Sequence, residues 1–484
     1  MNTHQRFHFR PATWLLGTAL ATLSACATGP AYERPSAAAP AAFKEAPAAD
    51  SNWFAAAPAD ALERGPWWQL FGDPALSALV EQVQVSNQNV AAAVAAYAQA
   101  QALVRQENAA LFPSLALNAS ATRSGGGAAT LAKPTNLQLG LGASWEPDIW
   151  GQLHLAVTSA QASAQASAAN LAAARLSAQA ALATDYFALR EADNEIALLS
   201  AAVSAYERAL KITQNQYAAA IAQRTDLLQA QTQLESTRAN LTATVAQRAL
   251  LEHAIALLVG RAPADFSVAV ADWQAKVPGV PLVLPSELLQ RRPDIAAAER
   301  AVAAANAQIG IQRAAYFPSL GLSASYGSAG SNLPSLLRAS NSLWSLGLSA
   351  AQSLFDAGAT SARVEGASAA RDAAVAAYRQ SVLSAFQAVE DQLAKSRSLA
   401  QQEGQRFAAS SAADLAEKLT LNQYLQGQVP YTSVVTAQVT ALSARQTLSQ
   451  LRSSRQAAAI ALIQALGGGW HAPTADEADE VAAL

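Results

Sequence analysis

The stretch Leu137 to Trp145 reads Leu-Gln-Leu-Gly-Leu-Gly-Ala-Ser-Trp, with apolar side chains at every second position and polar or very small ones between them. Trp344 to Ala351 repeats this pattern as Trp-Ser-Leu-Gly-Leu-Ser-Ala-Ala. Because successive strand residues point to opposite faces, both stretches predict strands with one apolar face and one small or polar face. The same alternation at 115–119 and 320–326 supplies a partner strand for each.

The apolar face of these strands needs a cover, and two interpretations compete. In a soluble sandwich the apolar faces pack on each other. In an outer-membrane barrel they contact lipid, and aromatic residues lie near the rims. Trp145, Tyr326 and Trp344 lie near predicted strand ends, where an aromatic girdle at the membrane interface would be. Four strands cannot close a barrel and open edges are not tolerated in lipid, so membrane strands would require several chains that share one barrel.

Very long helices are predicted after each strand pair. No glycine or proline occurs between Gly151 and Gly260, and apolar residues recur every seven positions from Leu182 to Tyr217, as in a coiled-coil seam. A helix over 152–217 would be about 100 Å long at 1.5 Å per residue. A return helix completes an antiparallel hairpin, and the turn is expected between Tyr217 and Thr225.

The chain also repeats itself with a long period. Tyr217 and Tyr424, like Gly260 and Gly467, are 207 residues apart (424 − 217, 467 − 260). Such a period predicts two structurally equivalent halves, each with a helix, two strands and two long helices.

Shorter helices are expected before each strand pair. The apolar spacing between Asp73 and Leu111 predicts one helix, with Asp73 as its cap and Pro74 in its first turn. A second helix is expected to start with Asp294 as its cap. The proline-rich segment 262–285 is expected to connect the halves, and the acidic tail is expected to be disordered.

Residues 1–26 have the pattern of an export signal. Arg6 and Arg10 precede an apolar stretch, Trp14 to Leu23, that is too short to span a bilayer. The segment ends at Cys26, the single cysteine of the chain, in a context that resembles a bacterial lipobox. We therefore expect lipid on Cys26, which anchors a protein without spanning the membrane. The alternative is an ordinary cleavage site with an incidental cysteine.

Composition and motifs argue against several other classes of protein. The net charge is −3 and no basic stripe suggests nucleic acid. The histidines that follow the signal lack metal-ligand spacing, and no phosphate-binding loop or nucleophile elbow is present. One methionine and one cysteine argue against a soft-metal site. We expect no catalytic residue, no metal site and no cofactor apart from the covalent lipid.

Several motifs together resemble one family. They occur in the expected order and cover nearly the whole chain after the signal: Gly-Pro-Ala-Tyr-Glu-Arg-Pro at 29–35, Trp-Trp-Gln-Leu-Phe-Gly-Asp-Pro at 67–74, Arg-Arg-Pro-Asp-Ile at 291–295, Phe-Pro-Ser-Leu at 112–115 and 317–320, and Leu-Phe-Asp-Ala-Gly at 354–358. The chain resembles the outer-membrane efflux proteins of the TolC superfamily, in particular the NodT or OprM-like lipoproteins.

This resemblance implies an α+β membrane protein: a trimeric twelve-stranded β-barrel with four strands per chain, a long α-helical barrel and a mixed equatorial region. It implies a passive duct across the periplasm, anchored by lipid in the outer membrane, that exports drugs or other small toxic compounds. The implied partners are two further copies of the chain, a periplasmic adaptor (membrane fusion) protein, an inner-membrane pump of the RND type, and outer-membrane lipid.

The expected boundaries follow from the motifs and the repeat. They are a signal peptide at 1–25, a lipidated arm and equatorial segment at 26–72, the first repeat at 73–260, a connector at 261–285, the second repeat at 286–467 and a disordered acidic tail at 468–484.

The resemblance also places a periplasmic gate and adaptor contact at the two turns between long helices. Its residues would be Tyr217, Arg224, Asp226, Tyr424, Gly427, Gln428 and Tyr431. In a trimer, Asp226 could form a carboxylate ring that favours cations, with Arg224 as its nearest partner, or it could simply cap the return helix. The chain departs from the family pattern at Ala220, where glycine is expected, and at Gln428, Val429 and Thr436, where charged residues are expected.

Two other functions remain as alternatives. A duct for a type I protein secretion system would share the architecture, but such proteins usually lack the lipobox, so Cys26 favours efflux. A periplasmic lipoprotein scaffold without a pore would not need strands with a lipid-facing surface.

Overall fold

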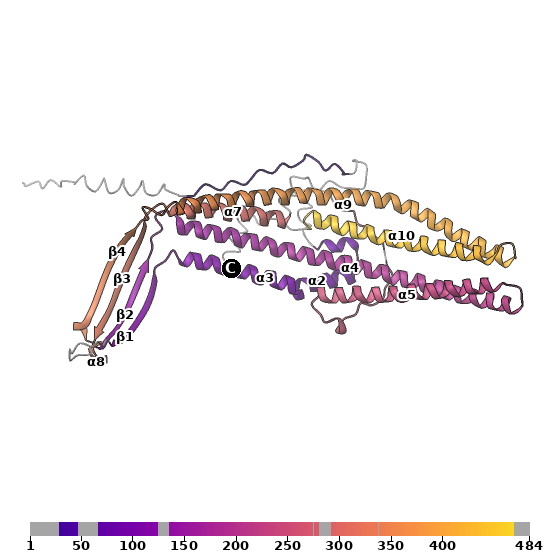
Figure 1. Cartoon of the computed structure of the whole chain (residues 1–484), viewed down its shortest axis with the longest axis horizontal. Helices are drawn as coiled ribbons and strands as arrows, with labels where there is room; N and C mark the ends of the chain where they lie inside the picture. The colour runs from indigo at the N-terminus through magenta and orange to yellow at the C-terminus, as the bar shows by residue number, and fades with distance from the viewer. Residues whose placement is uncertain are drawn as a thin grey trace, which may run out of the picture. The chain divides into compact units, whose positions relative to one another are not determined.

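The computed structural model describes residues 29–46, 66–123, 135–273, 275–279, 292–336 and 338–468 (Figure 1). Three features that were predicted from the sequence lie outside the described residues: Cys26, Arg291 and the acidic tail. The chain divides into two compact units: Met1–Ser36, Ala96–Ala168 and Ala297–Arg379 form the first, and Ala37–Ala95, Ala169–Ala296 and Gln380–Leu484 form the second.

The first unit contains the four predicted strands. They are β1 (Ser114–Arg123), β2 (Thr135–Trp145), β3 (Ser319–Gly330) and β4 (Ser342–Ala351), and they form one antiparallel sheet in the order β1-β2-β3-β4. Two short helices, α8 (Leu333–Leu336) and η4 (Ala339–Asn341), connect β3 to β4. Neither β1 nor β4 has a second neighbouring strand among the described residues, so both edges of the sheet are open.

The register aligns the apolar side chains of all four strands on one face. One row joins Leu117, Leu141, Tyr326 and Trp344. Most of this face is exposed, including Trp344 at 78% and Leu117 at 69%. The opposite face carries small or polar residues, for example the row Ala116, Gly142, Ser325 and Ser345.

The helix predicted from Asp73 to Leu111 is two helices, so that prediction was wrong in one respect. Asp73 caps α2 (Pro74–Ser86) as expected, and its carboxylate accepts from the backbone of Ala75 and Leu76. The helix stops at Asn87, whose side chain caps α3 (Gln88–Ala109) and also donates to the carbonyl of Leu258. An asparagine that bonds its own following backbone competes with a continuous helix.

The long helices have the predicted extents. α4 (Gln152–Ala218) and α9 (Ala359–Leu425) each contain 67 residues, and α5 (Arg224–Leu258) and α10 (Tyr431–Ala465) each contain 35. The turn after α4 lies within the predicted interval. No helix in the described parts of the chain combines the length and the apolar character that crossing a membrane requires.

The predicted coiled-coil seam of α4 changes position along the helix. Leu182 and Leu189 are buried as expected, but Tyr217, the last residue of the predicted seam, is 43% exposed. The buried positions are instead Leu199, Tyr206 and Thr213, which also recur every seven residues. A straight helix rotates by about 20° per heptad relative to a strict seven-residue repeat, so the buried stripe shifts sideways.

The described residues contain three further helices outside the strand connection and the hairpins. α7 (Pro293–Ala314) includes Asp294 in its first turn, and the Asp294 carboxylate pairs with Arg292 at 2.6 Å. The prediction that Asp294 is the residue that caps this helix was therefore wrong. The segment after α5 contains only the short helix η3 (Pro263–Asp265) among its described residues. Before α2, the helix η2 (Trp67–Phe71) buries both of its tryptophans.

The N-terminal arm is extended and lies against helices. In the first unit, Asn306 of α7 donates to the carbonyl of Pro30 at 2.9 Å, and Tyr32 hydrogen-bonds the carboxylate of Glu299. In the second unit, Phe43 is buried beside Phe386, and the carboxylate of Glu390 accepts from the backbone of residues 44 and 45. The arm is therefore held by specific contacts along its described length.

Candidate functional site

The two turns between long helices, both in the second unit, are built on the same helix ending. After α4, Ile221 N–H donates to the carbonyl of Gln216, and after α9, Gln428 N–H donates to that of Gln423. A second, inner bond completes the Schellman motif in each turn. This motif needs one residue with positive φ, which is Ala220 at 58° in the first turn and Gly427 at 72° in the second.

Alanine is strained at this position. A left-handed conformation costs a non-glycine residue about 1 to 2 kcal/mol, because its Cβ approaches the following carbonyl. Gly427 avoids this cost. Ala220, which stands where the family pattern has glycine, thus keeps the geometry of the turn but adds this strain to the first turn.

The helices that leave the turns start differently. α5 starts with a capping box, in which Asp226 accepts from the backbone N–H of Gln223 at 3.2 Å and the Gln223 side chain accepts in return. α10 starts after Pro430, which provides no side-chain cap. Asp226 therefore caps a helix in the single chain. Among the described residues Arg224 has no ion pair with it, although the sequence suggested this pairing.

A small core joins the two hairpins beside the turns. Tyr431 and Val434 of α10 pack with Ala230 of α5, and all three are at most 4% exposed. Leu210 of α4 and Tyr424 of α9 complete the cluster from its edge. Every one of the four long helices thus contributes a residue, and this contact holds one hairpin against the other.

Tyr424 adds a polar contact to this core. Its hydroxyl donates to Oε1 of Gln216 on α4 at 2.6 Å, and its ring centroid lies 5.3 Å from that of Tyr431. The pKa of Tyr431 is raised to about 12, mainly because its hydroxyl is buried and to a smaller extent because Tyr424 lies nearby. Burial also raises the pKa of Tyr424. Both hydroxyls therefore stay neutral over the ordinary pH range, and both rings link the hairpins.

The other predicted gate residues lie on the surface of the chain. Tyr217 is 43% exposed, and Arg224 and Gln428 are exposed as well. The side-chain amide of Gln428 donates to the neighbouring Gln426 side chain at 3.0 Å. The structure thus brings Tyr424 and Tyr431 together in one cluster, whereas Tyr217, Arg224 and Gln428 are available for contacts outside the chain.

A groove runs along the second hairpin behind its turn. It has a volume of about 420 Å³, and small or hydroxyl side chains line it: Ala413, Ala416, Thr420, Thr432, Ser433, Thr436, Ala437 and Thr440. No charged side chain of the described residues lines the groove, so it would accept a helix of modest polarity.

Sequence reasoning missed a matched pair of ion pairs that brace the hairpins. Arg238 of α5 contacts Glu207 of α4 at 2.7 Å, and Arg445 of α10 contacts Asp414 of α9 at 2.8 Å. Both partners differ by 207 positions between hairpins (445 − 238, 414 − 207). The repeat could have revealed them, if charged residues had been compared in addition to glycines and tyrosines.

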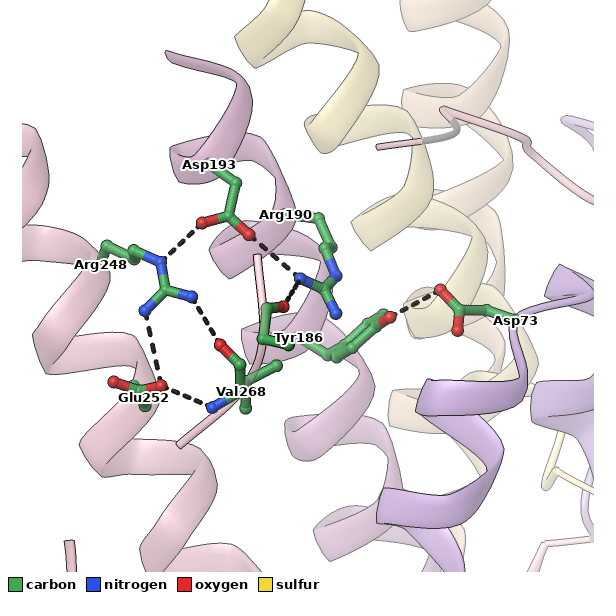
Figure 2. Close-up of polar contacts among 8 residues, drawn as sticks. Asp73, Tyr186, Arg190, Asp193, Arg248, Glu252 and Val268 are labelled. Carbon is green, nitrogen blue, oxygen red and sulfur yellow. Dashed lines mark hydrogen bonds and ion pairs between the residues drawn. The ribbon is translucent and has the colours of Figure 1, made fainter. Parts of the chain in front are cut away.

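A second network, drawn in Figure 2, holds the start of the connector. Asp193 of α4 lies between Arg190, at 3.0 Å, and Arg248 of α5, at 2.6 Å. The two arginines donate to the carbonyls of residues 269 and 268, and Glu252 accepts from the backbone of Val268. Asp193 and Arg190 are almost fully buried, so this network is a structural support. No sequence spacing indicated it.

The three predicted interface aromatics lie on the apolar face of the sheet at two levels. Trp145 is the last residue of β2, pairs with Leu322, and donates its indole N–H to the carbonyl of Leu111 at 2.9 Å. Tyr326 and Trp344 are opposite each other, four residues further along β3. The levels are separated by about 13 Å along the strand.

The described residues contain no group of three or more histidine, cysteine or acidic side chains placed to hold a metal ion. The geometry therefore consists of an exposed apolar sheet, two turns joined by a tyrosine cluster and a groove behind one turn. These features are typical of a surface that meets lipid and other proteins.

Comparison with known proteins identifies similar chains along almost the whole length. The family model "Outer membrane efflux protein" matches residues 79–261 and again 284–468. The cation efflux system protein CusC of Escherichia coli O6:H1 is 30% identical over 453 residues, which span 93% of this chain and 96% of CusC. The pyoverdine export outer membrane protein OpmQ of Pseudomonas aeruginosa is 32% identical over 451 residues, or 89% of this chain and 93% of OpmQ.

Solved structures agree with the sequence matches. The outer-membrane channel OprN superposes with a TM-score of 0.83 at 29% identity and covers 92% of this chain and 100% of its own. A structure of CusC superposes with a TM-score of 0.80 at 27% identity and covers 91% of this chain and 99% of its own.

Proposed function

We propose that this chain, which belongs to the outer membrane efflux protein family, is the outer-membrane duct of a tripartite efflux system. Its relatives are named as channels and efflux proteins of the outer membrane. This protein is also located in the outer membrane. The family consists of channel proteins and not of enzymes. The observation that carries the proposal is the four-stranded sheet with an exposed apolar face and two open edges.

Lipid explains both features of this sheet. An exposed apolar face is stable against acyl chains, but the unpaired backbone of an open edge is not tolerated there. If β4 of one chain pairs with β1 of the next, three chains close a twelve-stranded barrel in which no edge is left open. The small residues on the other face then line the lumen. We therefore propose a homotrimer.

The long helices would continue this barrel as a tunnel into the periplasm, and the turns would form its closed end. The tyrosine cluster of Tyr424 and Tyr431 supports this role, because it fixes the two hairpins of one chain together. Opening the tunnel then requires these contacts to separate. Asp226, repeated in three chains, would face cations there in addition to capping α5.

The proposed partners are a periplasmic adaptor and an inner-membrane pump of the RND type. CusC, OpmQ and the toluene efflux protein TtgC of Pseudomonas putida, by their names, belong to systems that export cations, pyoverdine and toluene. We propose small toxic compounds as the cargo of this chain. The uncharged groove beside Thr432 and Thr436 is suited to the adaptor, because helices of modest polarity pack closely against small and hydroxyl side chains.

We also propose a lipid anchor on Cys26. Gly29 is the third residue after Cys26, which limits the distance between them to about 11 Å. Gly29 lies against Gly310 of α7: a Cβ added to Gly310 would be 2.6 Å from the Cα of Gly29. α7 leads directly to β3, so a lipid at Cys26 would be near the sheet. A Cys26→Ala variant should lose incorporation of radiolabelled palmitate; unchanged labelling would refute the anchor.

Reconstitution in a planar bilayer tests the duct itself. The purified protein should have the mass of three chains and should show discrete conductance steps, which become larger or more frequent when the tyrosine cluster is loosened by Tyr424→Phe. A matched variant, Tyr217→Phe, alters the equivalent residue of the first turn. The Tyr217 hydroxyl has no hydrogen-bond partner among the described residues, so this variant should behave as wild type. A trimer without any conductance in either variant would reject the proposal.

A further inference from the structure

The charged side chains around the sheet are sorted by sign along the strands. The described residues of 111–123, 135–151, 316–336 and 338–358 contain two basic side chains, Arg123 and Arg338, and three acidic ones, Glu146, Asp148 and Asp356. The acidic residues all lie where the strands lead into α4 and α9. Both arginines lie at the opposite end of the sheet.

The topology fixes this placement. Arg123 is the last residue of β1, and Arg338 lies in the connection from β3 to β4. β1 and β3 are both antiparallel to β2, so they run in the same direction. The last residues of β1 and β3 therefore lie at the same end of the sheet. Figure 1 shows α8, which precedes Arg338, at that end of the strands. We name Arg123 and Arg338 the distal basic rim.

The distance from the level of Trp145 to Arg123 matches the thickness of a membrane. Ser144 pairs with Ser114, so Trp145 is level with Pro113, ten residues before Arg123 (123 − 113). Ten residues span about 33 Å along a strand. At the tilt of 35–45° that is usual for outer-membrane barrels, this is about 25 Å across the membrane, the height of their apolar band. With Trp145 at the periplasmic interface, Arg123 therefore reaches the outer one.

Both arginines are available to a ligand. Their side chains are exposed, and neither guanidinium has an ion pair or hydrogen bond with any residue that the structure describes. Arg123 has the same parity along β1 as Leu115 and Leu117, so it lies on the lipid-facing side of the strand. The acidic residues at the other end leave this rim without a competing negative charge.

We propose that the distal basic rim binds the phosphate groups of a phosphorylated glycolipid in the outer leaflet of the membrane. The inference rests on the proposed function, which places this sheet in the outer membrane. Guanidinium groups match phosphate oxygens with paired hydrogen bonds, and the acyl chains of the same molecule would cover the apolar rows below. Charge complementarity and the apolar band thus select one ligand with both properties.

Binding of purified diphosphorylated lipid A to the full-length protein in neutral phosphatidylcholine nanodiscs tests this. Arg123→Gln with Arg338→Gln should weaken binding by about 25-fold, at roughly fivefold for each arginine near an anionic lipid surface. The matched control is Arg105→Gln with Arg406→Gln, two exposed arginines on α3 and α9 with no ion pair among the described residues, and it should bind as wild type.

Three results would contradict the proposal that the distal basic rim binds the glycolipid. They are unchanged binding in the rim variant, an equal loss in the control variant, and equal wild-type affinity for lipid A from which both phosphates have been removed. Conductance of the same samples separates this inference from the proposed function. A rim variant that conducts normally but loses binding of lipid A supports the proposed binding site. A wild-type protein that never conducts refutes the proposed duct, and the binding measurement then still tests the lipid A site by itself.

Discussion

The two turns between long helices share a backbone design but differ in what they hold. Each ends its incoming helix with the same Schellman motif, and Tyr217 corresponds to Tyr424 across the repeat. The first turn continues into a polar capping box, whereas the second places Tyr431 in a core with α5. The residue equivalent to Tyr431 in the first turn is the exposed Arg224 (431 − 224 = 207). The second turn is therefore stabilised by a buried side chain, Tyr431, whereas the first turn has the charged side chains Arg224 and Asp226.

The largest test of this difference is truncation of Tyr431. Tyr431→Ala should lower the local free energy of opening around residues 424–436 by about 3 kcal/mol, since it empties a site that is only 4% exposed. Arg224→Ala, at the equivalent place in the first turn, should change it by less than about 0.5 kcal/mol. Hydrogen exchange of the turn amides measures both. Equal effects would mean that the turns do not divide the roles.

Alkaline pH should act mainly on the second turn. The pKa of Tyr431 is raised from 10.0 to about 12 in the folded chain, so its stabilising effect is complete below pH 10 and is lost as the pH rises through 12. A shift of this size corresponds to about 2 to 3 kcal/mol. Open probability in a planar bilayer should therefore rise above pH 10. Tyr431→Phe keeps the ring but cannot ionise, and its profile should be flatter; identical profiles would contradict this assignment.

Exchanging the residues with positive φ tests the shared backbone. Ala220→Gly should stabilise the first turn by about 1 kcal/mol, and Gly427→Ala should destabilise the second by about as much. No atom lies within 4 Å of a Cβ added at Gly427, so the effect there comes from the backbone alone. Hydrogen exchange of residues 216–223 and 423–430 reports each change separately. The same sign for both substitutions would disprove the strain at Ala220.

Sequence patterns predicted the elements of this fold well because each has a local signature. The strands follow from side-chain alternation, and the long helices follow from the absence of glycine and proline between Gly151 and Gly260. The break at Asn87 was missed because its side chain also bonds a carbonyl 171 residues away. The same limit applies to the site. Tyr424 and Tyr431 could be picked out by the repeat, but their contacts with Gln216 and Ala230 depend on how the hairpins pack.

The hydrogen bond from Tyr424 to Gln216 is a smaller contribution than the packing of Tyr431. Tyr424→Phe removes the donor and should cost about 1 kcal/mol, or about a fivefold increase in the opening equilibrium. Tyr217→Phe removes a hydroxyl that has no partner among the described residues, so it should have no effect on single-channel opening. If both variants open alike, the contact with Gln216 does not hold the hairpins.

Asp226 gives the smallest effect on stability and the clearest test of the charge assigned to the first turn. Asp226→Ala removes the capping contact with Gln223 and should destabilise the start of α5 by about 0.5 to 1 kcal/mol. Ser433→Ala, at the equivalent position of α10, removes no cap contact and should be neutral.

The cap and the proposed carboxylate ring are separated by Asp226→Asn. Asparagine keeps an oxygen that can accept from the backbone N–H of Gln223 but removes the charge. The stability of α5 should therefore remain near that of wild type, while the preference of the channel for cations falls. Reversal potentials in a salt gradient measure this preference. A cation preference that is unchanged in both Asp226→Asn and Asp226→Ala would restrict Asp226 to the role of a helix cap, and the first turn would then lack the charge-based function that distinguishes it from the second.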